Sequence, residues 1–173
     1  MVHEVCEHCD SCGKFVEAAE LKIVPIVLEL PTEWKMAGKE LAGQEDRENV
    51  SGCFEPGACD CYAFWTALAG QRQNPKLSWK IVVGLPCFGA ARGLGQHLWV
   101  RVNSRDYDWL EFLELKNGAT SLKEVVYFEW KLLSPDEADP RKPEFVAGRN
   151  WSQSCRDWAT MRHLLSAEIS RYR

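Results

Sequence analysis

Apolar and polar residues alternate most regularly in residues 96–103. From position 98 every second residue of this stretch is leucine or valine, whereas His97 and Trp99 fall between them. Because successive side chains of a strand point to opposite faces of a sheet, the pattern predicts a strand with one apolar face and a second face carrying His97 and Trp99. A turn at Ser104–Asp106 and a return strand over 107–115 would complete a hairpin.

Other apolar stretches favour short strands and longer helices. The β-branched run over 21–30 favours a strand, and Pro25 requires an edge position or a bulge because proline cannot donate to the ladder. Residues 58–69 are apolar on most sides and predict a buried helix that ends at Gly70. In chain order, the remaining patterns predict a helix from Pro31 through Leu41, a polar loop over 42–53, a strand over 79–85, a glycine-rich loop over 86–95, a strand or helix over 125–133, and a closing helix over 154–172.

Length and charge narrow the class of protein. A chain of 173 residues is long enough for one domain with a hydrophobic core and short for two, so we expect a cysteine-rich segment over 1–14 and a single domain over 15–173. The net charge of -4, without a basic stripe, argues against a nucleic-acid partner. The N-terminus lacks a signal-peptide pattern, and no stretch approaches the ~18 apolar residues of a membrane helix. We therefore expect a cytoplasmic protein without a membrane partner, whose eight cysteines are mostly thiols or metal ligands.

Three of these cysteines recur at three-residue spacing, as Cys6, Cys9 and Cys12. Cys9-x-x-Cys12 followed by glycine has the form of a zinc knuckle, in which the glycine lets backbone N–H groups turn toward the sulfurs. A structural zinc needs a fourth ligand, for which the candidates are His3, His8, Cys53 and Cys155. The alternative interpretation is a flexible, cysteine-rich tail. In either case we expect no cofactor in catalysis.

Cys59 stands where the predicted buried helix begins. Pro56 and Gly57 precede it, and such residues commonly come just before the first turn of a helix. The unpaired N–H groups and the positive end of the helix dipole in that turn favour a thiolate over a thiol. Since the thiolate is the nucleophile, Cys59 is a candidate for thiol catalysis, although a cysteine in an apolar helix is more often an inert core residue.

Thiol catalysis also needs an imidazole to carry the proton and a group that orients the imidazole. His97 is the candidate base, because it opens a strand directly after the glycine-rich loop. A three-residue turn at Ser104–Asp106 would place Glu111 diagonal to His97 on the same face of the sheet, and a turn at Asn103–Arg105 would place it directly opposite. An even-length turn or a bulge would bring Glu114 to that face instead. Asp108 is expected to lie too close to the turn, so Glu111 is the expected orienting acid and Glu114 its alternative.

Three longer stretches, together with Val83-Gly84 between the first and the second, share a pattern with a known group of enzymes. They are Gly57-Ala58-Cys59-Asp60-Cys61-Tyr62-Ala63, Gly95-Gln96-His97-Leu98-Trp99-Val100 and Tyr107-Asp108-Trp109-Leu110-Glu111. Together they resemble the transglutaminase-like cysteine proteinase superfamily, in the form of its small bacterial and phage members. The resemblance covers residues 50–115. It implies an α+β, papain/transglutaminase-like fold, in which a helix bearing the cysteine packs on an antiparallel sheet bearing the histidine and the acid.

The resemblance also implies roles: Cys59 as nucleophile, His97 as base and Glu111 as orienting acid. Cys59 would attack a peptide bond or a glutamine carboxamide of a protein or peptide substrate. Water would resolve the thioester in a cysteine protease or amidase, and an amine would do so in a transglutaminase. The alternative is a catalytically inactive binding or structural protein on the same fold, including one encoded by a phage, because fold does not determine function. Peptide:N-glycanases, which combine zinc-binding cysteine pairs with such a core, are a third interpretation.

Overall fold

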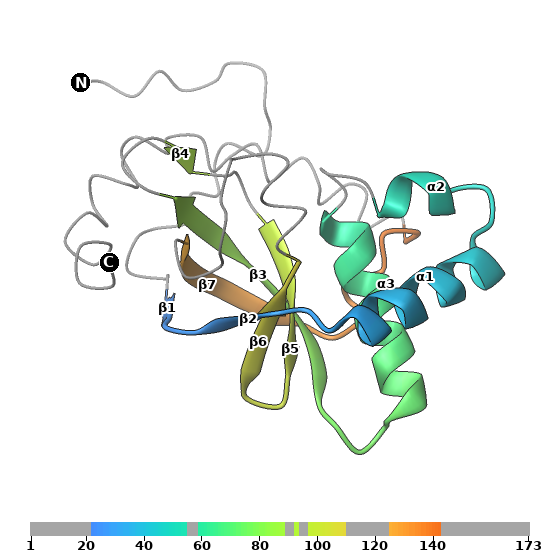
Figure 1. The fold of residues 1–173 in the computed structure, drawn as a ribbon, viewed down its shortest axis with the longest axis horizontal. Coiled ribbons are helices and arrows are strands. Elements are labelled where there is room, and N and C mark those ends of the chain that lie inside the picture. Colours follow the sequence, from blue (N-terminus) through green and yellow to red (C-terminus); the bar gives the residue numbers. More distant parts are fainter. Residues whose placement is uncertain (1–21, 55–58, 89–91, 94–96, 110–124, 143–173) are drawn as a thin grey trace.

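A computed structural model of the chain describes residues 22–54, 59–88, 92–93, 97–109 and 125–142. Within these residues the chain forms a mixed α+β structure, with the helices gathered beside a sheet (Figure 1). In chain order, the elements are β1 (Lys22–Val24), β2 (Val27–Glu29), α1 (Thr32–Glu45), α2 (Val50–Cys53), α3 (Cys59–Gln73), β3 (Trp79–Phe88), β4 (Arg92–Gly93), β5 (His97–Val102), β6 (Arg105–Asp108) and β7 (Val125–Leu133).

The described strands form one seven-stranded sheet with the order β1-β7-β3-β5-β6-β2, and β4 pairs with β3 outside this path. β1 and β2 therefore lie at opposite ends of the strand order, although only Pro25 and Ile26 separate them in the chain. Because two residues span less than about 10 Å, the sheet must curl strongly to bring its two ends together. The predicted strand over 21–30 is thus two edge strands, and Pro25 lies in the break between them, as its missing N–H requires.

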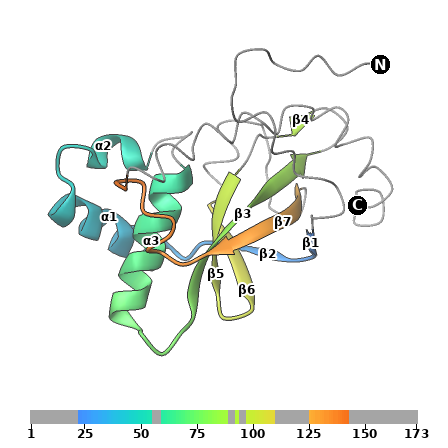
Figure 2. The same ribbon diagram turned by 180° about the vertical axis from the view of Figure 1, so that it is seen from behind.

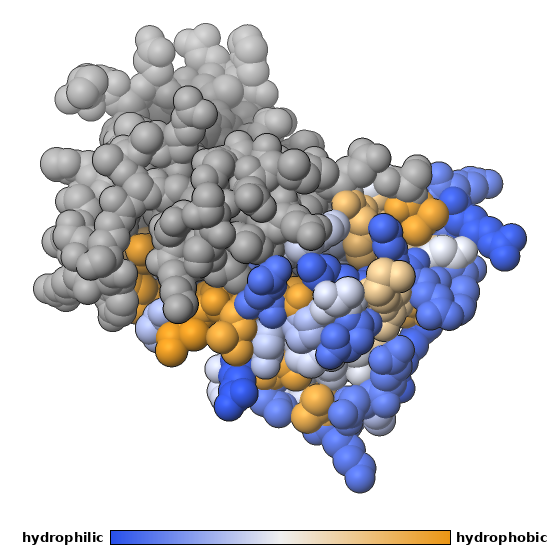
Figure 3. Space-filling model, in the orientation of Figure 1, coloured by the Kyte–Doolittle hydropathy of each residue, from blue (hydrophilic) through white to orange (hydrophobic). Residues whose placement is uncertain are grey.

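The long helix α3 packs on one face of the sheet. Its apolar side chains join those of β3 and β5 in one core, and α1 covers the helix from outside (Figure 1). Fully buried residues of this core include Tyr62, Ala63, Trp65, Ala67, Ile81, Val83 and Val100. The outer surface of the helical layer is largely hydrophilic, with isolated apolar positions (Figure 3). This arrangement confirms the predicted buried helix and its position beside the predicted hairpin.

The opposite face of the sheet holds a second, smaller core. It contains Trp99, Tyr127 and three valines, Val24, Val82 and Val125. Since Leu98, Val100 and Val102 belong to the first core, the predicted alternation along β5 is confirmed. Trp99 therefore lies on the face of the sheet that α3 does not cover, and His97 shares that side of β5 at the strand end near the start of α3.

Two glycines allow close packing that a side chain would prevent. Gly70, predicted to end the central helix, lies inside α3, where an added Cβ would stand 2.4 Å from the ring of Trp79. The helix continues to Gln73, so the prediction of its end was wrong. Gly84 pairs with His97 across β3 and β5, and a Cβ there would lie 2.5 Å from the ring of Trp99. Gly84 thus leaves room for the indole beside the candidate base.

The remaining elements modify the predictions at their ends. The helix predicted from Pro31 is confirmed as α1, but it continues to Glu45, and α2 follows inside the segment predicted as a loop. The ambiguous stretch over 125–133 is strand β7. Seen from behind, residues 134–142 lead from β7 back to the helices, where the guanidinium of Arg141 lies 4.8 Å from the ring centre of Trp65 (Figure 2). The predicted closing helix over 154–172 lies outside the described residues.

Among the described helices, none has both the length and the apolar character needed to cross a membrane.

Candidate active site

Cys59 is the first residue of α3, which confirms its predicted place in the first turn of the central helix. It is a free cysteine, partly exposed, and it packs against the edge of the first core. The backbone N–H groups of such a turn lack partners within the helix and point outward beyond its N-terminus. Cys59 therefore combines access to solvent with a setting that stabilises negative charge.

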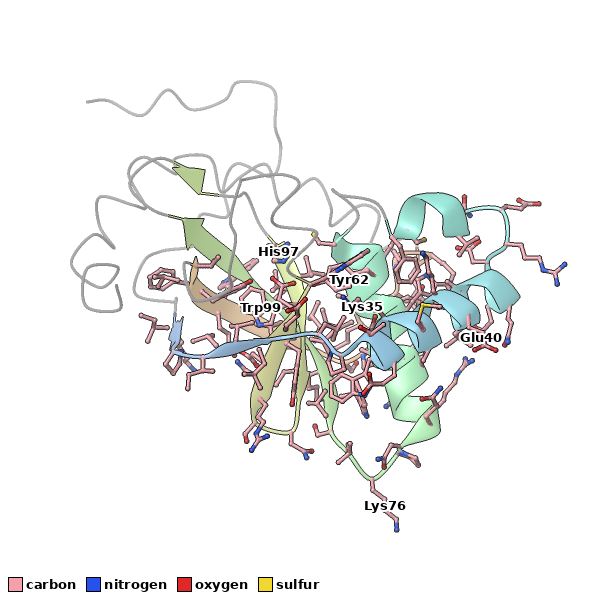
Figure 4. All side chains as sticks on the ribbon, viewed as in Figure 1. Lys35, Glu40, Tyr62, Lys76, His97 and Trp99 are labelled. Atoms are coloured by element: carbon pink, nitrogen blue, oxygen red, sulfur yellow. The ribbon has the colours of Figure 1, made fainter. Side chains whose placement is uncertain are left out.

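His97 opens β5 and is almost fully buried, with 2% of its surface exposed. Its ring stacks near Trp99, with centroids 6.2 Å apart. Figure 4 shows His97 at the end of β5 that lies near the start of α3, close to Tyr62 of that helix. The side chain of Cys59 lies close enough to His97 to help raise the pKa of the imidazole, so the structure brings the predicted nucleophile and base together.

The carboxylate beside His97 belongs to Asp108. Its two oxygens lie 3.1 and 2.9 Å from Nε2 of His97. Asp108 is the last residue of β6 and is completely buried. The prediction that Asp108 lies too close to the turn to contact His97 was therefore wrong. The expected acid Glu111 and its alternative Glu114 lie outside the described residues.

Asp108 reaches His97 because the hairpin turn is shorter than predicted. Val102 pairs with Arg105, so only Asn103 and Ser104 form the turn. Asn103 has φ of 54°, a left-handed conformation that asparagine tolerates and that two-residue hairpin turns use. In this register Asp108 continues the ladder opposite Trp99. It is therefore diagonal to His97 on the same face of the sheet, within reach of an imidazole.

Three further donors surround the buried carboxylate. The hydroxyl of Tyr62 donates to Oδ1 and that of Tyr127 to Oδ2, and the backbone N–H of Trp109 lies 2.8 Å from Oδ1. Tyr62 also lies 3.2 Å from the carbonyl oxygen of Leu98. These contacts tie α3 and β7 to the hairpin at the position of the acid.

Burial and charge pairing have opposite effects on the pKa values of His97 and Asp108. Burial alone would lower the pKa of His97, but the charge and hydrogen bond of Asp108, together with the contact of Cys59, raise it to about 10. Burial would raise the pKa of Asp108, yet His97 and the hydroxyls of Tyr127 and Tyr62 hold it below its ordinary range. Burial, reinforced by the negative charge of Asp108, raises the pKa values of both tyrosines well above 10. Asp108 is therefore an anion, His97 holds a proton, and both phenols stay neutral.

Sequence reasoning missed Tyr62 and Tyr127 as parts of this site. Tyr62 follows Cys59 by three residues, so one helical turn brings it to the same side of α3. That spacing was visible in the sequence, although nothing in it named a partner. Tyr127 lies in an aromatic and β-branched run, where only the pairing of β7 with β3 places it beside the hairpin.

The predicted zinc site is outside the part of the chain that can be described. Cys6, Cys9 and Cys12 precede residue 22, the first described residue. Within the described residues, no three His, Cys, Asp or Glu side chains are grouped to hold a metal ion. Cys53, named as a candidate fourth ligand, is buried at the end of α2, with its sulfur 3.3 Å from the carbonyl oxygen of Asn49.

No family model matches this chain, and no curated protein or solved structure is significantly similar to it.

Proposed function

We propose that this protein is a thiol-dependent acyl-transfer enzyme of the transglutaminase-like class that acts on a carboxamide of a peptide or protein. The observation that carries the proposal is that Cys59, His97 and Asp108 interact in series, with Nε2 of His97 2.9 Å from the Asp108 carboxylate. A nucleophile, a base and an orienting acid in this order are the minimum that thiol catalysis needs. Asp108 takes the role that sequence reasoning gave to Glu111.

In the proposed reaction, the proton of the Cys59 thiol already lies on His97, and the Cys59 thiolate attacks the carbonyl carbon of the carboxamide. The carbonyl π electrons move to the oxygen and form a tetrahedral oxyanion. As this intermediate collapses, the C–N bond breaks and His97 gives its proton to the leaving nitrogen. A thioester on Cys59 and a free amine result. Water then attacks the thioester and loses a proton to His97, and collapse of the second tetrahedral intermediate releases a carboxylic acid and returns the Cys59 thiolate beside the protonated His97.

The positions of the three groups support this sequence of steps. Because Nε2 of His97 faces Asp108, Nδ1 is the nitrogen left for the thiol and the leaving group. Asp108 is a positioning residue, since it touches the ring and not the reacting atoms. The first turn of α3 offers backbone N–H groups near Cys59, and such groups stabilise an oxyanion. The arrangement of the helix with its cysteine beside the strands that bear His97 and Asp108 is also the one that the family resemblance implies.

The test uses p-nitrophenyl acetate, a reactive acyl donor that does not require a known substrate. We expect a burst of p-nitrophenol and an acetyl group that mass spectrometry locates on Cys59. Cys59→Ala should abolish the burst and leave the fold intact by circular dichroism. Cys61→Ala is the matched control, because Cys61 is a partly exposed cysteine on the same helix, about 200° around its axis from Cys59. It should keep the burst.

A burst that survives in Cys59→Ala, or acetyl groups spread evenly over the cysteines, would overturn the proposal. The chain would then be better described as a binding or structural protein on this architecture. Adding a primary amine to the wild-type reaction separates the two enzymatic outcomes. We expect hydrolysis to dominate, whereas quantitative transfer of the acetyl group to the amine would indicate a transglutaminase.

A further inference from the structure

We propose that Tyr62 and Tyr127 are positioning residues that hold Asp108 in its charged form while His97 gives up its proton, and this inference rests on the proposed function. Both tyrosines contact the acid through their hydroxyl groups. Their proposed role is thus exerted through Asp108. It concerns the half of the cycle in which the imidazole is neutral.

Within the described residues, the contacts of the Asp108 carboxylate are all with hydrogen-bond donors. Oδ1 faces the hydroxyl of Tyr62, the N–H of Trp109 and Nε2 of His97, and Oδ2 faces the hydroxyl of Tyr127 and the same ring nitrogen. The side chains of His97 and Asp108 are 3% and 0% exposed, so water contributes little. Each of the donors supplied by the described residues favours the ionised carboxylate over the protonated acid.

The proposed reaction makes this donor set necessary. When His97 delivers its proton to the leaving nitrogen, the ring becomes neutral and Asp108 loses its only charged partner among these contacts. A buried carboxylate without compensation is costly, and the simplest relief would be for Asp108 to keep the proton on His97. The two phenol hydroxyls donate in both states of the ring. They therefore lower the cost of the neutral-ring state and make proton release possible.

The two tyrosines approach the acid from different layers. Tyr62 comes from α3, one turn after Cys59, and Tyr127 comes from β7. Either hydroxyl can be removed without removing the ring, because Phe keeps the aromatic contacts of Tyr62 with Trp109 and of Tyr127 with Trp99. Tyr107→Phe is the matched control, since Tyr107 precedes Asp108 in β6 but packs its ring against Trp34.

The first experiment compares two acyl donors with the same acyl group in each variant. A p-nitrophenyl ester loses an anionic leaving group that needs no proton, whereas a p-nitroanilide must receive one from His97. We expect Tyr127→Phe and Tyr62→Phe to keep the acylation rate with the ester within about two-fold. With the anilide we expect a fall of about ten-fold or more, the usual effect of losing a hydrogen bond to a charged group. Tyr107→Phe should change neither rate.

Equal losses with ester and anilide would overturn the inference, because a merely structural role would affect both. So would an anilide rate that remains unchanged in both variants. If Tyr62→Phe fails to fold, Tyr127→Phe alone decides the outcome.

A second measurement does not depend on activity. The titration of the His97 ring, followed by NMR, should have its midpoint near pH 10 in the wild type. Removing either phenol should move that midpoint upward, since Asp108 then holds the proton on the ring more tightly. An unchanged or lowered midpoint would overturn the inference. If the wild type shows no acyl transfer but the midpoint rises in the variants, the proposed function fails and the role of the tyrosines stands.

Discussion

Replacing Asp108 by asparagine should remove most of the stability that the charged pair provides. The pKa of His97 is raised from 6.5 to about 10 in the folded protein, and this difference corresponds to about 5 kcal/mol. Because the folded-state pKa is the higher one, the stabilisation is fully present below about pH 6.5 and disappears as the pH rises toward about 10. Asp108→Asn also leaves His97 without its buried counter-charge. We therefore expect a loss of about 3–5 kcal/mol at pH 6.5, the range found when one member of a buried pair is removed.

Urea denaturation followed by tryptophan fluorescence measures this loss, at pH 6.5, 8 and 10 and with reductant present. The difference in unfolding free energy between wild type and Asp108→Asn should be largest at pH 6.5 and shrink toward pH 10, because the other titrating groups are common to both proteins. Asp136→Asn is the control, since Asp136 is exposed and its removal should change stability by less than about 0.5 kcal/mol. A difference below about 1 kcal/mol at pH 6.5, or one that does not shrink with pH, would refute the charged pair.

Three further outcomes follow from packing and position. Gly84→Ala should lower the melting temperature and cost about 1–3 kcal/mol of stability, because its Cβ would stand 2.1 Å from the carbonyl oxygen of Phe128. Gly43→Ala should raise the melting temperature and add up to ~1 kcal/mol of stability, because Gly43 lies in α1 with open space around it. Equal melting temperatures of the two variants would contradict both expectations. Arg101→Met should cost up to about 3 kcal/mol in urea titrations, because it removes the ion-pair partner of the buried Asp106 and the partly buried Glu129. A neutral result would show that these ion pairs contribute nothing. Cys61→Ala should leave the rate of acylation by p-nitrophenyl acetate within about two-fold of wild type. A complete loss of acylation in this variant would identify Cys61, and not Cys59, as the nucleophile.

Local patterns were enough to predict the central elements. The alternation over 96–103 gave strand β5 and the correct face for His97, because a strand with one apolar face obeys a period of two. The apolar segment after residue 58 gave the buried helix with Cys59 in its first turn. In both cases the candidate residue, Cys59 or His97, stands at the start of its element, and glycine or proline in the sequence just before it marks that start.

The third member of the site depended on a register that the sequence does not determine. Asn103-Ser104 forms a two-residue turn without the glycine that usually marks one, so a longer turn at 104–106 was the natural prediction. One residue of difference in turn length exchanges the faces of the return strand. Asp108 therefore came to face His97, and the prediction for Asp108 failed for this reason.

Contacts between distant segments were also beyond local reasoning. Tyr127 approaches Asp108 only because β7 pairs with β3 and not with its neighbours in the chain. Gly70 was read as a helix end because glycine commonly caps helices, whereas its role is to accept the ring of Trp79. Such roles depend on which surface packs against the residue, which the amino-acid sequence alone does not specify.

The most direct test of a working Cys59–His97 pair is the rate of alkylation by iodoacetamide across pH 5–9, with mass spectrometry to assign each site, in wild type and His97→Ala. We predict that Cys59 in the wild type reacts at least ten-fold faster than Cys61 near pH 6, and that His97→Ala removes this advantage, because the imidazolium that stabilises the thiolate is lost. Cys59 and Cys61 are both partly exposed on α3, so the comparison controls for access. Equal rates at the two cysteines in the wild type, or an advantage that survives in His97→Ala, would contradict a catalytic pair.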